Sequence, residues 1–80
     1  MRIIVTSTQL QTFAKRWPCA NFPEGLGVSF EFDTNGNLCD VEWFNGWSGK
    51  TVYEPEGYDE GALLAVSQDA QAGLIGSGPV

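Results

Sequence analysis

The chain contains no histidine, only two cysteines, and only four lysine and arginine residues in a total of 80. Without histidine, the serine, threonine and cysteine side chains lack their usual general base. Cys19 and Cys39 are too few to hold a structural zinc ion or to form the disulfide framework of a small secreted domain. Reduced thiols are expected, with a single Cys19–Cys39 bridge as the alternative. The sequence therefore predicts neither an enzyme, nor a metal site, nor a cofactor.

Long apolar runs and an excess of positive charge are also missing. No segment approaches the ~20 apolar residues of a membrane-spanning helix, and Ile3–Val5 is much shorter than the apolar region of a signal peptide. The formal net charge of −6 disfavours direct contact with nucleic acid or with anionic lipid. We therefore expect a cytoplasmic protein that binds neither membranes nor nucleic acid directly.

The residues that are present have the composition of a folded protein. Hydrophobic residues make up 42% of the chain and charged residues only 18%, which is too apolar for a disordered acidic segment. A chain of this length forms one domain, which we place at residues 1–73. Residues 74–80, which include glycine, serine and proline, are predicted to form a flexible C-terminal tail.

A one-sided helix is predicted after Thr6. Thr6 and Gln9 have the spacing of a capping box, in which each side chain accepts a hydrogen bond from the backbone N–H of the other residue. Four apolar residues follow at a spacing that places them on one helix face: Leu10, Phe13, Ala14 and Trp17. Because proline disfavours the helical conformation of the residue before it, Pro18 should end the helix at Trp17.

The clearest pattern is a β-hairpin around Asn35-Gly36. Apolar and polar residues alternate on both sides of this pair, and the apolar ones are Val28, Phe30, Phe32, Cys39, Val41 and Trp43. Asn-Gly is favoured in two-residue turns because both residues tolerate positive φ. Such a turn pairs Phe30 with Val41 and Phe32 with Cys39. A register slip of one residue would bring carboxylates onto the buried face.

A third strand and a second helix complete the expected fold. Lys50–Tyr53 is predicted as a short strand, and Asp59 as the N-cap of a helix that ends before Gly73. The apolar stripe of this helix is predicted to consist of Leu63, Leu64, Val66 and Ala70. The sequence thus predicts an α+β fold, with an antiparallel three-stranded sheet and two helices packed on one of its faces. Ile3–Val5 is available as a fourth, edge strand.

Negative charge is concentrated in residues 24–60, which hold nine of the ten acidic residues and a single basic residue, Lys50. The hairpin register places some of these acids on the exposed face of the sheet: Glu31 opposite Asp40, Ser29 opposite Glu42, and Asp33 beside Leu38. Like charges directly opposite each other destabilise a sheet, and such local conflicts often mark function. Two interpretations stay open. The acids solvate an exposed face, or they form a negative array, spaced by about 4.8 and 6.8 Å, that replaces nucleic-acid phosphates in a basic groove.

A second acidic segment follows the third strand, and it contains Glu54, Glu56, Asp59 and Glu60 together with Tyr53 and Tyr58. Tyrosine is a common interface anchor, but Tyr53 or Tyr58 could equally cap the edge of the core. The alternating aspartates and glycine of a calcium-binding loop are missing from this segment. Trp47 lies in a glycine-rich turn and, if exposed, would be a further partner contact.

In size, acidity, single compact domain and lack of an active site, the chain resembles the small accessory proteins of bacteriophages and prophages, including anti-CRISPR and other anti-defence inhibitors. The resemblance covers the general character of the whole chain and involves no motif. It implies a stoichiometric inhibitor of a host nucleic-acid-handling complex, and such inhibitors often occupy the DNA-binding channel. Members that dimerise their target or sequester a nucleotide signal fit the same description.

The leading hypothesis is a non-enzymatic inhibitor, monomeric or homodimeric, that presents acidic residues to a basic nucleic-acid-binding surface of a host protein complex, as a DNA mimic would. The residues predicted to contact this partner are Glu31, Asp33, Asp40, Glu42, Trp47, Glu54, Glu56, Tyr58, Asp59 and Glu60. One alternative is an oligomeric sponge for a small nucleotide signal, with Trp43, Trp47 and Tyr53 lining a pocket between subunits. The small number of cations ranks it lower. The other alternative is an assembly adaptor of a phage or bacterial complex.

Overall fold

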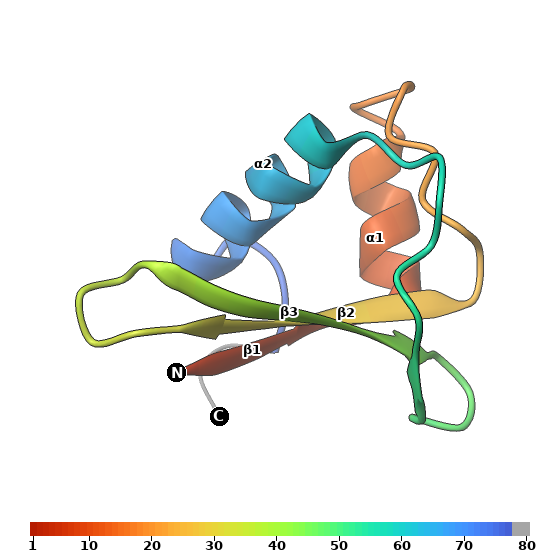
Figure 1. Cartoon of the computed structure of the whole chain (residues 1–80). Helices are drawn as coiled ribbons and strands as arrows, with labels where there is room; N and C mark the ends of the chain where they lie inside the picture. Colours follow the sequence, from red (N-terminus) through yellow and green to blue (C-terminus); the bar gives the residue numbers. More distant parts are fainter. Residues whose placement is uncertain (78–80) are drawn as a thin grey trace.

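The computed structural model describes residues 1–77 and contains four strands and two helices (Figure 1). In chain order they are β1 (Arg2–Val5), α1 (Ser7–Ala14), β2 (Leu26–Phe32), β3 (Leu38–Asn45), β4 (Thr51–Val52) and α2 (Glu60–Gln71). The strands form one sheet in the order β1-β2-β3-β4, and every neighbouring pair is antiparallel. Both helices lie on the same face of this sheet. The predicted α+β class is confirmed, and the N-terminal segment supplies the fourth, edge strand.

The start of α1 follows the predicted capping box. Gln9 N–H donates to Thr6 Oγ1 at 3.2 Å, and Thr6 N–H donates to Gln9 Oε1 at 2.9 Å. The predicted end at Trp17 is wrong, because the helix ends at Ala14. Beyond that residue the backbone tightens: Trp17 N–H bonds the carbonyl of Ala14, three residues back, at 3.1 Å. The tighter turn carries the chain out of the helix before Pro18.

The β2–β3 hairpin has the predicted register along most of its length. Phe30 pairs with Val41, and Glu31 pairs with Asp40. Nearer the turn the register shifts by one residue, so that Phe32 pairs with Leu38. The predicted pairing of Phe32 with Cys39 is therefore wrong, and Cys39 is exposed at a bulge.

The chemistry of the turn explains this shift. Gly36 has a φ of +82°, but Asn35 is not in the left-handed region, so the two-residue turn that needs both residues there does not form. Instead, Gly36 N–H donates to the carbonyl of Asp33 at 3.0 Å, and Asp33 N–H donates to that of Asn37 at 2.9 Å. Three residues, 34–36, form the loop, and Asp33 closes it, so its predicted place beside Leu38 is also wrong.

The short β4 strand and α2 agree with the sequence in outline. β4 has two residues, because only Thr51 and Val52 pair with β3, whereas four were predicted. Asp59 is the N-cap of α2, and its Oδ1 accepts the N–H of Gly61 at 2.8 Å. The helix ends in a Schellman motif, in which Gly73 has a φ of +78° and Leu74 N–H reaches the carbonyl of Asp69 at 2.9 Å.

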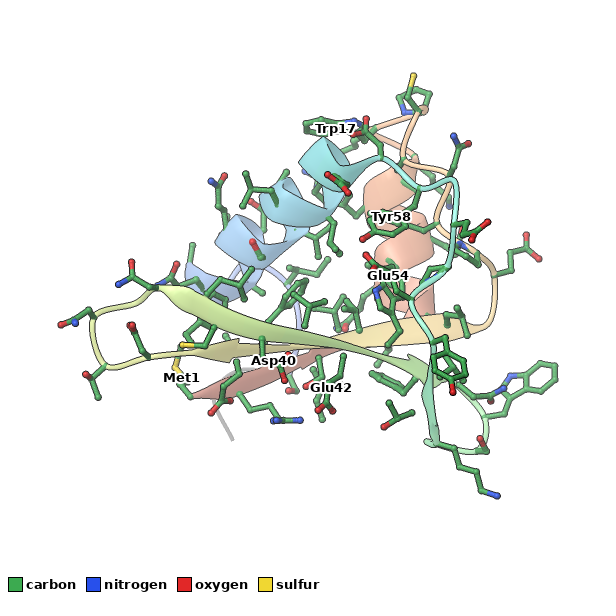
Figure 2. All side chains as sticks on the ribbon, viewed as in Figure 1. Met1, Trp17, Asp40, Glu42, Glu54 and Tyr58 are labelled. Carbon is green, nitrogen blue, oxygen red and sulfur yellow. The ribbon has the colours of Figure 1, made fainter. Side chains whose placement is uncertain are left out.

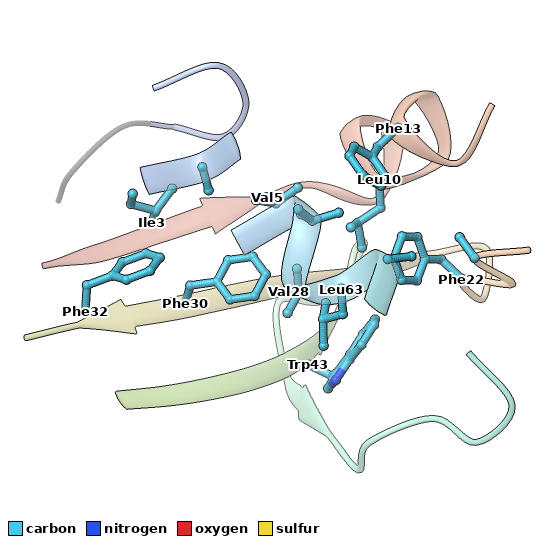
Figure 3. Close-up of a cluster of buried hydrophobic side chains, with 14 residues drawn as sticks. Ile3, Val5, Leu10, Phe13, Phe22, Val28, Phe30, Phe32, Trp43 and Leu63 are labelled. Carbon is cyan, nitrogen blue, oxygen red and sulfur yellow. The ribbon is translucent and has the colours of Figure 1, made fainter. Parts of the chain in front are cut away.

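The core lies between the sheet and the two helices (Figure 3). β1 contributes Ile3 and Val5, and β2 contributes Val28, Phe30 and Phe32. The helices supply buried side chains from the other side: Leu10, Phe13, Ala62, Leu63, Val66 and Ala70. Leu64 was predicted in this layer but is 54% exposed, because it lies on the solvent side of α2.

The segment after α2 returns to the free edge of β1. Ser77 N–H donates to the carbonyl of Ile4 at 2.9 Å, and Ile4 N–H donates to Ser77 Oγ at 3.3 Å. Ile75 is half-buried against the core. Gly76 lies so close to β1 that a Cβ atom there would be 2.8 Å from Ile3 Cγ2. Residues 74–77 thus contact the domain, and the rest of the predicted tail lies outside the described residues.

Candidate binding surfaces

The sheet face opposite the helices, called here the outer face, carries three of the predicted carboxylates. Side chains alternate between the two faces of a strand, so residues that pair directly share a face. One cross-strand row is Arg2, Glu31 and Asp40, and the next is Ile4, Ser29 and Glu42. Figure 2 shows Asp40 and Glu42 on this side of the sheet. No helix among residues 1–77 covers them.

Arg2 lies among these carboxylates, a position that the sequence pattern did not predict. Its Nη1 is 3.3 Å from Glu42 Oε2, and its Nε is 3.7 Å from Glu31 Oε2. The same Nη1 donates to Ser29 Oγ at 3.3 Å. Arg2 therefore compensates part of the negative charge and links three strands. The only signal in the sequence was the possible edge strand itself, which pairs Arg2 with Glu31.

Of the three outer-face carboxylates, Asp40 is the one whose negative charge is least compensated by cations. Its Oδ1 accepts the N–H of Val41 at 2.9 Å, and no ion pair involves Asp40 within the described residues. Asp40 is exposed, whereas Glu31 and Glu42 are half-buried. Glu31 and Asp40 are directly opposite each other, as predicted. Their repulsion is reduced by two cations of the β1 end, Arg2 and the amino group of Met1, which lies 3.7 Å from Glu31 Oε1.

Asp33 belongs to the hairpin turn rather than to the outer face. Its Oδ1 accepts the N–H groups of Asn35 at 2.9 Å and Asn37 at 2.8 Å. The hydrogen bond from Asn37 N–H, supported by those from Asn35 and Gly36, holds the pKa of Asp33 below its ordinary value. Asp33 is a turn-stabilising residue, so the structure separates it from Glu31, Asp40 and Glu42.

The predicted second acidic segment, residues 53–60, connects β4 to α2, and two of its members have structural roles. Asp59 caps α2, and its Oδ2 also accepts the indole N–H of Trp17 at 3.2 Å. Glu60 is exposed in the first turn of α2, where a negative charge suits the helix dipole. Glu54 and Glu56 are exposed in the loop itself.

Tyr58 closes the edge of the core, which was the alternative to an interface role. Its ring centroid is 5.2 Å from that of Trp43 and 6.3 Å from that of Phe22. Its hydroxyl donates a hydrogen bond to Glu54 Oε1, and Figure 2 shows the two side chains next to each other. Burial first, and then the hydrogen bond and negative charge of Glu54, raise the pKa of Tyr58 to about 12. The phenol therefore stays protonated, and a donor, at neutral pH.

Two aromatic side chains project from the β3–β4 end of the molecule. Trp47 is 94% exposed and Tyr53 is 97% exposed. The turn that carries Trp47 is held by Asn45, whose Oδ1 accepts the N–H groups of Trp47 at 2.8 Å and Ser48 at 3.0 Å. The Trp47 indole is therefore almost fully exposed on a turn that is held by hydrogen bonds.

A hollow of about 280 Å³ lies where β3, β4, the 53–58 loop and α2 meet; we call it the β3–loop hollow. It is lined by Val41, Glu42, Trp43, Thr51, Val52, Glu54, Tyr58 and Leu63. A second hollow, of about 260 Å³, lies on the outer face, and Glu42 and Thr51 line both. The two hollows are therefore neighbours across the same strands.

The described residues contain no group of three or more acidic, cysteine or histidine side chains placed to hold a metal ion. Among the same residues, no helix is long and apolar enough to cross a membrane. No protein-family model, curated protein or solved structure matches the chain.

Proposed function

We propose that this protein is a non-enzymatic binding protein that presents its outer face to a basic, nucleic-acid-binding surface of a host protein complex. The observation that carries the proposal is the sheet face left open by both helices, which holds Glu31, Asp40 and Glu42 against two cations, Arg2 and the amino group of Met1. A partner rich in lysine and arginine complements this charge, and occupation of its groove would exclude nucleic acid.

Anchoring is assigned to Trp47 and Tyr53 at the β3–β4 end of the molecule. Charge complementarity accelerates association but often adds little affinity by itself, whereas buried aromatic side chains contribute much of the binding energy at interfaces. Both side chains are almost fully exposed. The proposal therefore combines electrostatic attraction over the sheet with aromatic contacts at one end.

The arrangement of aromatic residues favours this function over the nucleotide sponge. Trp43, one of the three aromatic residues assigned to the sponge pocket, is only 3% exposed and belongs to the core. Trp47 and Tyr53 line neither of the two hollows described above. Arg2, which lines the outer-face hollow, is already ion-paired with Glu31 and Glu42.

The test compares wild type with Asp40→Lys and with Asp69→Lys. Both variants make the same change in net charge, but Asp69 lies on α2, on the helix side of the sheet. Proteins retained from host extract by wild type and by Asp69→Lys, but lost with Asp40→Lys, would be identified by mass spectrometry and purified. We expect a nucleic-acid-binding complex whose association slows as salt rises, because screening shortens the reach of the field to about 8 Å at physiological ionic strength.

Competition provides the decisive measurement. DNA or RNA should displace the protein from the purified complex, and inhibition should need about one molecule of protein per target site. The proposal would be contradicted if nucleic acid bound the complex at the same time as this protein without loss of affinity. It would also be contradicted if the protein inhibited its target, with turnover, at far less than one molecule per target site. Asp40→Lys rather than Glu31→Lys is the informative reversal, since a lysine at position 31 would face Arg2 and disturb the sheet itself.

A further inference from the structure

The β3–loop hollow has the chemistry of a site for a basic side chain. Its floor is apolar and consists of Val41, Val52 and Leu63. Its wall is aromatic, where Tyr58 packs against Trp43. Glu54 supplies a carboxylate at the rim, and no lysine or arginine of residues 1–77 lines the hollow. An apolar floor, aromatic rings and one carboxylate match a methylene chain that ends in a cation.

We infer that the β3–loop hollow receives a lysine or arginine side chain of the protein partner, with its stem on Val41 and Val52 and its cation at Glu54 Oε2, beside the Tyr58 ring. This inference rests on the proposed function and names the contact that the partner makes beyond the outer face. The two hollows share Glu42 and Thr51, so a partner that covers the outer face and crosses β4 reaches both.

Glu54 is the available carboxylate of the hollow. Glu42 also lines it, but the Glu42 carboxylate is bonded to Arg2 on the outer face. Glu54 accepts the Tyr58 hydroxyl on Oε1, which fixes its position and leaves Oε2 for a cationic donor, since a carboxylate accepts several hydrogen bonds. The side chain of Glu54 is thus oriented before the partner arrives, which lowers the entropic cost of binding.

The test uses isotope-labelled protein and an acetylated, amidated pentalysine peptide at low salt. Chemical-shift changes would be followed at the Trp43 indole N–H and at the amides of Glu54 and Tyr58. We expect the shifts there to saturate as peptide is added. Glu54→Gln should lower the affinity for the peptide about fivefold, which is the upper range for one exposed charge pair. Glutamine still accepts the Tyr58 hydroxyl, so the loop should keep its structure, and the dispersion of the amide spectrum would verify this.

Glu56→Gln is the matched control, because it removes the same charge from the same loop at a residue that does not line the hollow. It should weaken binding by less than about twofold. Tyr58→Phe keeps the aromatic ring but removes the hydroxyl that holds Glu54, so it should weaken binding by about twofold, less than Glu54→Gln does.

The outcomes separate this inference from the proposed function. Equal effects of Glu54→Gln and Glu56→Gln would overturn the hollow as a site, because only the general charge of the loop would then matter. If the shifts instead centred on the outer face and were lost with Asp40→Lys, the proposed function would survive without the hollow. Shifts confined to the hollow would support the site and contradict the role of the outer face. No binding of pentalysine at low salt would overturn both.

Discussion

Individual acidic residues of this chain have different roles, although the sequence presents them as one class. Asp33 closes a turn, Asp59 caps α2, Glu54 bonds Tyr58, and only Asp40 on the outer face is exposed and far from a cation. A carboxylate that accepts backbone N–H groups stabilises the fold locally, and its presence says little about a partner. Charge counts along the sequence therefore overestimate how many carboxylates share the outer face.

Asp33 provides a test of this distinction. Asp33→Ala removes the acceptor of two backbone N–H groups and should lower the melting temperature, whereas Asp33→Asn keeps an acceptor and should lower it less. Because the pKa of Asp33 is lower in the folded protein than its ordinary value, the stabilisation by its charge is complete above pH ~4 and is lost as pH falls through the folded pKa.

The measurement is a series of thermal melts between pH 5 and pH 2. The difference in melting temperature between wild type and Asp33→Asn should become smaller as the pH falls. A difference that stays constant over the whole series would show that the charge of Asp33 is irrelevant to the turn.

At the scale of elements, sequence patterns were most successful where the interaction is local. The capping box of Thr6 and Gln9 needs only residues three apart, and the register of Phe30 with Val41 follows from strand alternation next to a turn. The bulge at Cys39 was missed because the carboxylate of Asp33 selects a three-residue loop over the Asn-Gly turn. Turn type depends on side-chain hydrogen bonds that the alternation pattern does not contain.

The candidate site was less predictable, because it depends on contacts between distant segments. Arg2 meets Glu42 across 40 positions of sequence, and only the packing of β1 against β2 brings them together. The β3–loop hollow likewise needs Tyr58 to fold back onto Trp43. The sequence indicated the tyrosine and the glutamates, but not that Tyr58 and Glu54 would form a unit with the core.

The hairpin turn itself can be tested at Gly36. Its φ of +82° is unfavourable for any residue with a Cβ, so Gly36→Val should destabilise the protein by at least ~1 kcal/mol. The added Cβ would also lie 2.5 Å from Gln71 Nε2, which donates to the Gly36 carbonyl at 2.6 Å. Thr34→Val, in the same loop, is the control and should change stability by less than ~0.5 kcal/mol. Chemical denaturation would measure both, and equal stability of the two variants would refute the left-handed conformation at Gly36.

For the whole molecule, the single sheet separates two environments. One face is covered by both helices and packs with them into the only large core of the described residues. The other face bears Arg2 and the carboxylates of Glu31, Asp40 and Glu42. A domain of 80 residues has little stability in reserve, so each segment that covers the core matters. The segment after α2 is such a cover, because it packs Ile75 against the core and bonds the free edge of β1 through Ser77.

This contact makes the C-terminal boundary of the domain testable. A chain that ends at Gly73 loses the packing of Ile75 and two hydrogen bonds between Ser77 and Ile4, so its free energy of unfolding should fall by about 1–3 kcal/mol. A chain that ends at Ser77 keeps the packing of Ile75 and both hydrogen bonds to Ile4, so it is the matched control and should be more stable than the chain that ends at Gly73. Denaturant melts would compare the three, and hydrogen exchange at the Ile4 amide should accelerate only in the shorter chain.

Equal stability of all three would instead favour a domain that ends at residue 73, followed by a tail that makes no energetic contribution. Ile4 also lines the outer-face hollow. Loss of this segment should therefore loosen the β1 edge that holds Arg2, and with it the ion pairs that Arg2 makes with Glu31 and Glu42.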